Sequence, residues 1–330
     1  MKPDQLYIGI DSGTQGTKGI VYSRARCKVL AEAYAEHRII ENNQGRREQD
    51  PAWWIEACTS VMETVLAHKA VNRDNVCAIG VSGQQHGMVA LDREGQVIRP
   101  AKLWCDTETS VQCDILTEAA GGMSRVIDLI GNAVAVGFTA SKIVWLKQEE
   151  PEAYDRLATV LLPHDYLNFW LTGERRTEYG DASGTAYFDV RSRKWSPEIL
   201  NAIDPSGKLA ACLPDLIASE APHGVIRPAI ARQFGLSETT LVSSGGGDNM
   251  MGAIGTGNVA KGVVTTSLGT SGTIYAFSES PVIDPKGELA AFCSSSGGWL
   301  PLVCSMNVTV STELIRDLLG LDIEGLNQKA

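Results

Sequence analysis

The sequence predicts an α/β protein with two domains. At 330 residues the chain is longer than one ordinary domain. Short β-prone runs alternate with stretches of helical periodicity, which is the pattern of an α/β fold with a mixed sheet. An arrangement of strand, glycine turn and strand occurs near the amino terminus and again after residue 260. We therefore expect a boundary near Val242–Gly247 that divides the chain into residues 1–244 and 245–330.

The first domain is expected to open with an antiparallel meander. β-prone runs at 5–10, 19–22 and 29–34 are separated by short turns, which is the spacing of consecutive hairpins. A helix is then predicted from Asp50 and Pro51, because aspartate caps free N–H groups and proline suits the first helical position. The apolar face of this helix holds Trp53, Trp54, Ala57, Val61, Val65 and Leu66, with both tryptophans expected in packing.

The remaining elements continue the alternation. A continuous apolar strand is predicted at 76–81, and helices are predicted at 140–149 and 166–171. Beyond the boundary, strands are expected at 263–267 and 273–277, with a glycine turn between them. The chain then ends in a helical, polar stretch.

The composition excludes several classes of function. Hydrophobic residues make up 44% of the chain and charged residues 21%, as in a globular protein with a substantial core. The net charge is −10 and no block of five like charges occurs, so neither nucleic acid nor a membrane is an expected partner. The eight cysteines form no CxxC pair and no zinc-like cluster, and are expected as small buried hydrophobes. Lacking a secretory signal and a transmembrane run, the sequence predicts a cytoplasmic protein.

A glycine cluster around Asp248 is the first candidate site. The stretch reads SSGGGDNMMGAIGTGN from Ser243, with three glycines directly before the aspartate. Clustered glycines indicate unusual backbone angles or the close approach of a ligand. A flexible linker is the alternative, but linkers rarely carry an apolar run such as Met250, Met251, Ala253 and Ile254. The stretch therefore favours a site.

The turn from Asp11 to Lys18 is the second candidate. Its glycines and hydroxyls present N–H and O–H donors that suit a phosphate oxyanion, and Asp11 at its mouth suits Mg²⁺ bound through water. An ordinary tight turn, with Asp11 bonding its own backbone, explains the pattern equally well when it is taken alone. The similar turn at Ser267–Gly272 favours the phosphate interpretation, because two such hairpins could clamp a nucleotide tail.

An ordered series of motifs runs along the chain. The motifs are DSGT at 11–14, EQDP at 48–51, SGQQHG at 82–87, LWCD at 103–106, GFTASK at 137–142, LPHDYL at 162–167, GDASGT at 180–185, GGGDN at 245–249 and SLGTSG at 267–272. Together they are similar, across essentially the whole chain, to the FGGY family of carbohydrate kinases, and within it most similar to the xylulokinases. The resemblance implies an actin-like ATPase fold, which is ribonuclease H-like, with two domains hinged around ATP.

The resemblance assigns functions to both domains. Residues 1–244 match the sugar-binding domain, and residues 245–330 match the start of the nucleotide-binding domain. The second domain is expected to be incomplete, because no glycine-rich element for adenosine follows Gly297–Gly298. The implied reaction is ATP-dependent phosphorylation of D-xylulose at the 5-hydroxyl. Another kinase of the family, acting on glycerol, ribulose or gluconate, and a sugar-binding module without turnover remain as alternatives.

The resemblance also assigns residues. Asp248 matches the catalytic base, and Asp11 matches an aspartate that organises the metal and the phosphates. The sugar contacts are Gln85, His86 and Asn249, with Trp104 and Asp106 in the pocket wall. ATP, with Mg²⁺, would contact Ser12, Gly13, Thr14, Thr17, Lys18, Gly269, Thr270 and Ser271.

Some of these assignments have structural alternatives. His86 could be a core histidine bonded to a carbonyl, Trp104 a core tryptophan and Asp106 a capping aspartate. Family members often carry an arginine after the residue that matches Asp106, whereas Thr107-Glu108-Thr109 stands here, which leaves the choice of sugar open. A homodimer is also left open, since the sequence does not determine the oligomeric state.

Overall fold

The first sheet grows from the predicted meander. In the computed structural model, which describes residues 4–269, 272–305 and 307–329, the first three strands pair antiparallel in sequence order, so the meander is confirmed. The sheet order is β14-β15-β6-β1-β2-β3, with β16 also paired to β6. The strands are β1 (Leu6–Ser12), β2 (Gly16–Ser23), β3 (Lys28–Glu36), β6 (Val76–Gly83), β14 (Pro222–Val225), β15 (Leu241–Ser243) and β16 (Gly246–Gly247).

The central pairings of this sheet are parallel. β6 pairs parallel with β1 on one side and with β15 and β16 on the other. The carboxyl ends of β1, β6 and β16 therefore meet at one edge of the sheet, where ligands of open α/β sheets usually bind. The sheet is mixed, as predicted.

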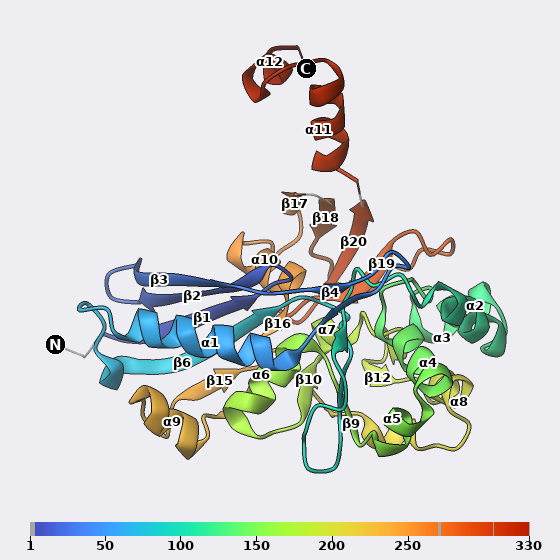
Figure 1. Ribbon diagram of the computed structural model, residues 1–330, viewed down its shortest axis with the longest axis horizontal. Helices are drawn as coiled ribbons and strands as arrows, with labels where there is room; N and C mark the ends of the chain where they lie inside the picture. The colour runs from blue at the N-terminus through green and yellow to red at the C-terminus, as the bar shows by residue number, and fades with distance from the viewer. Residues whose placement is uncertain (1–3, 270–271, 306, 330) are drawn as a thin grey trace.

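Helices cover this sheet, as Figure 1 shows for α1. α1 (Pro51–Leu66) begins as predicted: the Asp50 carboxylate accepts a hydrogen bond of 2.9 Å from the Ala52 N–H, and Pro51 takes the first position. Trp54 is buried in the core, whereas Trp53 is half-buried beneath the Arg38 guanidinium. α6 (Pro163–Thr172) and α9 (Pro228–Phe234) contribute to the same core. α6 begins at Pro163 rather than at Tyr166, because the Asp165 carboxylate accepts from the Leu162 N–H.

A largely helical region with its own apolar core follows β6 in the chain. The helix predicted at 140–149 is confirmed as α4. The helices are α2 (Ser110–Ala119), α3 (Met123–Ile130), α4 (Thr139–Glu149), α5 (Pro151–Arg156), α7 (Tyr179–Ala182) and α8 (Pro197–Ile203). Short paired strands accompany these helices, namely β7 (Val89–Leu91), β8 (Ala101–Lys102), β9 (Thr159–Leu161), β10 (Arg176–Glu178), β11 (Phe188–Asp189), β12 (Lys194–Trp195) and β13 (Asp215–Ile217). Two further short strands, β4 (Ile40–Glu41) and β5 (Arg47–Gln49), precede α1 and pair in the order β4-β5-β8.

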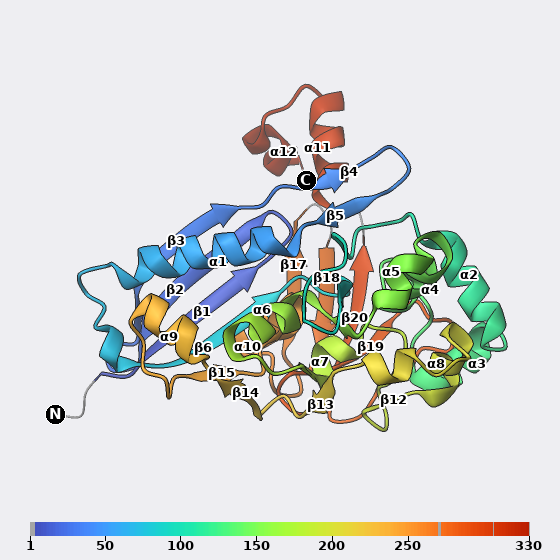
Figure 2. The same ribbon diagram turned by 60° about the horizontal axis from the view of Figure 1, so that its bottom comes forward.

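A second, antiparallel sheet begins after α10 (Asp248–Gly255). Its order is β17-β18-β20-β19, with bounds β17 (Val264–Leu268), β18 (Gly272–Ala276), β19 (Ala290–Cys293) and β20 (Trp299–Ser305). β17 and β18 confirm the two strands predicted there. Figure 2 places this sheet beside α10 and beyond the carboxyl ends of β1 and β6. Met250 and Ala253 of α10 pack with Tyr275, Phe292 and Leu300 in one cluster.

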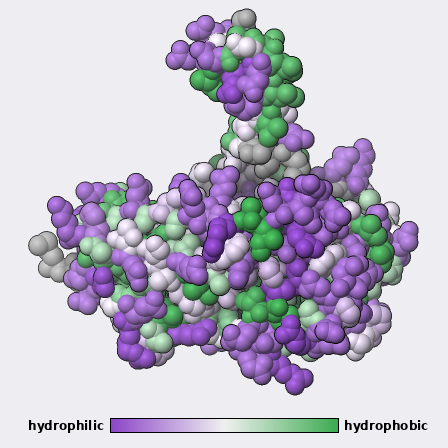
Figure 3. Space-filling model, viewed as in Figure 1, coloured by the Kyte–Doolittle hydropathy of each residue, from purple (hydrophilic) through white to green (hydrophobic). Residues whose placement is uncertain are grey.

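Helices α11 (Thr309–Leu318) and α12 (Ile323–Lys329) project from the second sheet (Figure 1). Figure 3 shows apolar side chains on this projection, and Leu314, Leu318 and Leu319 are exposed there. The second sheet also exposes Leu268 and Ile274. No helix in the described part of the chain is long and apolar enough to cross a bilayer.

The prediction that the cysteines are small buried hydrophobes is confirmed only in part. All eight are free thiols. Cys58, Cys113, Cys212 and Cys293 are buried, and burial raises the pKa of Cys58 and Cys293 to about 12. Cys27 and Cys304 are exposed.

A glycine in β2 permits the close packing of α1 on the sheet. A Cβ atom at Gly19 would collide with Cγ1 of Val61, a buried residue of α1. We expect Gly19→Ala to lower the free energy of unfolding by about 1–3 kcal/mol, the usual cost of overpacking. Urea denaturation measures this change.

Gly255 provides the matched control, because a Cβ atom there would meet nothing within 4 Å. Gly255→Ala should leave the free energy of unfolding unchanged or raise it. Equal effects of the two substitutions would contradict the packing argument.

Candidate functional site

A cavity of about 470 Å³ lies where the two sheets meet. The structure brings five predicted site residues to its wall: Gln85, His86, Trp104, Asp248 and Asn249. Residues of the second sheet complete it, among them Ser267 and Thr273. The wall also includes Cys105, Thr107, Asn132, Ala133, Ala135, Val136, Gly137, Phe138, Gly287, Glu288, Leu289, Ala290, Phe292, Leu302 and Cys304.

The glycines before Asp248 permit close packing within the protein. Gly245 has a φ of +67°, and a Cβ atom there would collide with the Val81 carbonyl oxygen of β6. A Cβ atom at Gly247 would lie 2.5 Å from Cγ of Gln85. The sequence interpretation expected these glycines to admit a ligand. The structure shows that they let β16 lie against β6, which places Asp248 beside Gln85. The approach of a ligand to this backbone stays a prediction.

Asp248 is the first residue of α10, and its two carboxylate oxygens differ. Oδ1 accepts the Asn249 backbone N–H at 2.8 Å and the Asn249 amide Nδ2 at 3.1 Å. Oδ2 accepts no hydrogen bond from the residues that the structure describes. Oδ2 is therefore free to take a proton from a molecule in the cavity.

The surroundings of Asp248 raise its pKa. Partial loss of hydration inside the protein is the main cause, and the charges of Asp181 and Asp11 add to it. The side chain is nevertheless exposed, so water still reaches the carboxylate and limits the rise. The position is that of a base whose proton affinity exceeds that of an ordinary aspartate.

Two side-chain amides are joined beside this carboxylate. Asn249 Nδ2 donates to Gln85 Oε1 at 2.8 Å, and Asn249 Oδ1 accepts from the Thr273 hydroxyl at 3.0 Å. Gln85 is 4% exposed, and its Nε2 has no partner among the described residues. An unpaired buried N–H group is costly, so the site is suited to a molecule that supplies an acceptor oxygen.

His86 has an unusual backbone and a neutral ring. Its φ of +61° lies in the left-handed region, which non-glycine residues rarely adopt. Its ring packs on Phe138 and Phe292, with centroids 4.6 and 5.5 Å away. Burial, with a smaller contribution from the nearby Lys142 charge, lowers the pKa of His86 to about 3. Its Nδ1 has no partner among the described residues, so it does not form the carbonyl bond of the core alternative.

The hairpin between β1 and β2 turns its hydroxyls toward the protein. Thr17 Oγ1 donates to Ser12 Oγ at 3.1 Å, and Thr14 Oγ1 donates to Gln84 at 3.1 Å. The sequence interpretation gave these hydroxyls to a ligand. Gly13 donates its N–H to the Gly16 carbonyl within the turn. Within the described chain, the backbone N–H groups of Thr14 and Gln15 donate to no residue.

Asp11 and Lys18 lie opposite each other on this hairpin. They are cross-strand partners of β1 and β2, and both side chains are exposed. Asp11 Oδ1 accepts from the Ser82 hydroxyl at 2.8 Å. Neither residue lines the cavity, although Asp11 is close enough for its charge to raise the pKa of Asp248.

The second hairpin is only partly described. Ser267 lines the cavity, and Gly269 is exposed and accepts the Thr309 N–H at 3.1 Å. Thr270 and Ser271, both assigned to ATP from the sequence, lie outside the described residues.

Trp104 and Asp106 lie in different environments in the structure. Trp104 lines the cavity and donates its indole N–H to Thr14 Oγ1 at 2.8 Å, which connects the cavity wall to the first hairpin. Asp106 is fully buried and is not among the cavity-lining residues. Its carboxylate lies 3.2 Å from Lys102 Nζ and accepts from the Arg47 N–H. This geometry differs from the sugar contact expected of Asp106, because the carboxylate is occupied by protein donors.

Lys102 holds three acidic side chains together. Its fully buried ammonium pairs with Glu48, Asp106 and Glu108. These carboxylates are close enough to one another to hold a metal ion, but the ammonium already supplies the positive charge. The cluster is therefore an ion-pair network behind the cavity wall.

The sequence interpretation missed part of the cavity wall. Phe138 lies inside the GFTASK motif, and Thr273 directly follows the second hairpin. Their places beside recognised motifs could therefore have indicated both residues as part of the site. Asn132, Phe292 and Leu302 carried no such signal, because only the folded chain brings them to the cavity.

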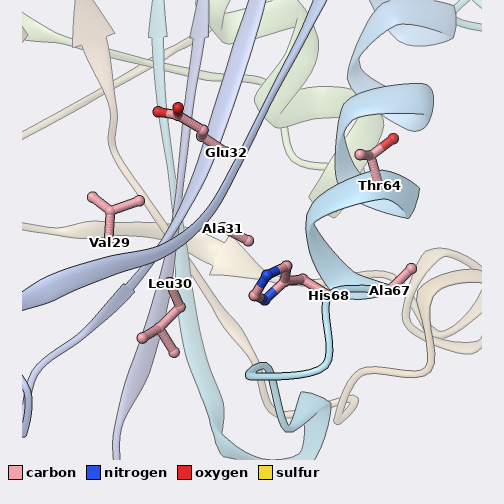
Figure 4. Close-up of a pocket in the computed structure, with 7 residues that line it drawn as sticks. All are labelled: Val29, Leu30, Ala31, Glu32, Thr64, Ala67 and His68. Carbon is pink, nitrogen blue, oxygen red and sulfur yellow. The ribbon is translucent and has the colours of Figure 1, made fainter.

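A second hollow lies away from these residues. It is an open groove between β3 and the end of α1, shown in Figure 4. Its lining includes Glu32, Thr64 and His68 but none of the predicted site residues. The cavity between the sheets is therefore the candidate site.

Comparisons with known proteins show which proteins this chain is similar to. Residues 6–255 match the FGGY family of carbohydrate kinases, N-terminal domain. The chain is similar to a xylulose kinase of Haemophilus influenzae, with 49% identity over 98% of this chain and 67% of the relative. It is also similar to a xylulose kinase of Streptomyces rubiginosus, with 38% identity over 97% of this chain and 64% of the relative.

A solved structure shows the same fold. The crystal structure of a xyloylose kinase from Brucella ovis superposes with a TM-score of 0.91 and 32% identity, over 98% of this chain and 66% of that one. The chain therefore belongs to the FGGY family of carbohydrate kinases, and its fold is the actin-like ATPase fold of that family. It spans about two thirds of the length of these relatives.

The ion-pair network behind Trp104 gives a stability test. Lys102→Met would leave Glu48, Asp106 and Glu108 with less compensation, so we expect the free energy of unfolding to fall by about 3–5 kcal/mol. Urea denaturation checks this. Arg232→Met, which removes an exposed pair with Glu238, should have a much smaller effect. Similar losses for both variants would show that Lys102 does not hold the network together.

Proposed function

We propose that this chain carries the sugar site and part of the phosphate site of a kinase that transfers the γ-phosphoryl group of ATP to the 5-hydroxyl of D-xylulose. The observation that carries the proposal is Asp248, a carboxylate with one free oxygen at a cavity between two sheets. The names of the similar proteins support the choice of sugar. The domain division at residues 244 and 245 remains part of this proposal.

Asp248 would be the catalytic base. Phosphoryl transfer depends on positioning and charge neutralisation, and on a carboxylate that accepts the proton of the attacking hydroxyl. The two donors of Asn249 fix Oδ1. Oδ2 would then receive the proton as the sugar oxygen attacks phosphorus.

Side chains around the base would recognise the sugar. Gln85 Nε2 would donate to a hydroxyl or carbonyl oxygen, and neutral His86 can donate or accept. Phe138 and Phe292, with Trp104, offer apolar faces to the C–H groups of a sugar. The wall thus combines a few polar groups with an apolar surface, as small-molecule sites usually do.

The first hairpin fits a phosphate and its metal ion. The free backbone N–H groups of Thr14 and Gln15 suit phosphate oxygens, and exposed Lys18 adds positive charge. Asp11 offers one carboxylate, and Mg²⁺ commonly binds through one or two carboxylates with water and phosphate. Bound Mg²⁺ would neutralise phosphate charge during transfer.

A substrate panel tests the proposal. ADP release is measured with D-xylulose, D-ribulose, glycerol and gluconate, and calorimetry measures binding of each sugar and of ATP. D-xylulose should give the highest kcat/KM. Preference for another sugar identifies a different kinase of the family, and sugar binding without ATP binding identifies a binding module. No binding of any sugar contradicts the proposal.

Removal of the base should greatly slow turnover. Asp248→Asn keeps the shape of the side chain but cannot accept the proton, so sugar-dependent ADP release should fall about 10²–10⁴-fold. Asp215→Asn, at an exposed aspartate of β13 that does not line the cavity, is the matched control and should retain wild-type turnover. Near-normal turnover of Asp248→Asn rejects the assignment.

The raised pKa of Asp248 predicts the acid side of the pH profile. The base works only when ionised, so kcat/KM falls as the pH drops through its pKa. Because that pKa is raised, the midpoint of the fall should lie above the ordinary aspartate value of 3.8. Steady-state kinetics across pH measure it, with Asp215→Asn expected to share the wild-type midpoint. A midpoint at or below 3.8 contradicts the prediction.

A further inference from the structure

We propose that Thr273 is a positioning residue that orients Asn249 and, through it, both the base and the sugar-facing amide of Gln85. The inference rests on the proposed function and deepens it. Thr273 lies on β18 of the second sheet and lines the cavity. Gln85 follows β6 of the first sheet, so the connection joins the two sheets.

The connection is a chain of directed hydrogen bonds. The Thr273 hydroxyl donates to Asn249 Oδ1 at 3.0 Å. Asn249 Nδ2 then donates to Gln85 Oε1 at 2.8 Å and to Asp248 Oδ1 at 3.1 Å. We call this chain the amide relay.

The direction of the relay follows from its partners. The ionised carboxylate of Asp248 can only accept, so the NH₂ group of Asn249 must face it. The Asn249 oxygen then faces Thr273, whose hydroxyl can donate. Gln85 must present its oxygen to the Asn249 amide, which leaves Gln85 Nε2 as the free donor. A reversed Asn249 would set its oxygen against two acceptor oxygens.

This fixed direction has two consequences for the site. It gives the sugar site a donor, so the facing atom of the substrate must be an acceptor oxygen. It also keeps Asp248 Oδ1 occupied, which leaves Oδ2 as the oxygen that receives the proton. Thr273 contributes to both although it need not touch the sugar or the reacting atoms.

Removal of the Thr273 hydroxyl tests the relay. Thr273→Val keeps the side-chain shape but leaves Asn249 Oδ1 without its donor, and Thr273→Ser restores the hydroxyl. Thr266→Val, on an exposed position of neighbouring β17, is the matched control. Calorimetry with D-xylulose measures affinity, and NMR of the side-chain amides reports on Asn249 and Gln85 directly. Thermal melts of all variants establish that each is folded.

The expected result is specific to the hydroxyl. Thr273→Val should weaken D-xylulose binding about three- to tenfold, which corresponds to the loss of one hydrogen bond, and should shift both amide signals. Thr273→Ser and Thr266→Val should resemble the wild type. Unchanged amide signals in Thr273→Val, or a Thr273→Ser variant as weak as Thr273→Val, would overturn the relay.

The two proposals fail in different ways. A wild-type chain that binds no D-xylulose contradicts the proposed function, whatever Thr273 does. The amide signals then decide the relay alone: a shift in Thr273→Val that Thr273→Ser reverses supports it, and no shift overturns it.

Discussion

The site depends on how closely β16 approaches the end of β6. Gly245, Gly246 and Gly247 leave no side chain between the two strands, and a Cβ atom at Gly245 or Gly247 would collide with Val81 or Gln85. This contact starts α10 at the sheet edge with Asp248 as its first residue. Asp248, Asn249 and Gln85 take their positions from that contact, because each lies within two residues of β16 or of the end of β6.

Local sequence signals predicted much of the fold. The meander, the capped start of α1, the apolar strand β6, helix α4 and strands β17 and β18 each depend on nearby residues, whose periodicity and turn chemistry are visible in the sequence. The short paired strands such as β10 and β13 were missed because their partners are far apart in the chain. The start of α6 was missed for a different reason, since it depends on one capping bond of Asp165.

Five residues that were assigned from the ordered motifs lie at the candidate site. Gln85, His86, Trp104, Asp248 and Asn249 do meet at one cavity. Asp106 shared a motif with Trp104, but its environment is set by the buried Lys102 ammonium and by the Arg47 backbone N–H, contacts that the sequence does not reveal. Ser12 and Thr17 belong to the predicted hairpin, yet the direction of their hydroxyls depends on their mutual bond and on the bond between Thr17 and His37. Residue identity thus predicted location better than orientation.

Helix α10 begins directly after a strand of the first sheet and packs against the second sheet. Its first residue continues from β16, while Met250 and Ala253 are buried with Tyr275 and Leu300 of the second sheet. A movement of one sheet relative to the other would therefore also move α10, which carries the Asp248 carboxylate at its first residue. The same eight residues thus link the position of the carboxylate to the distance between the two sheets.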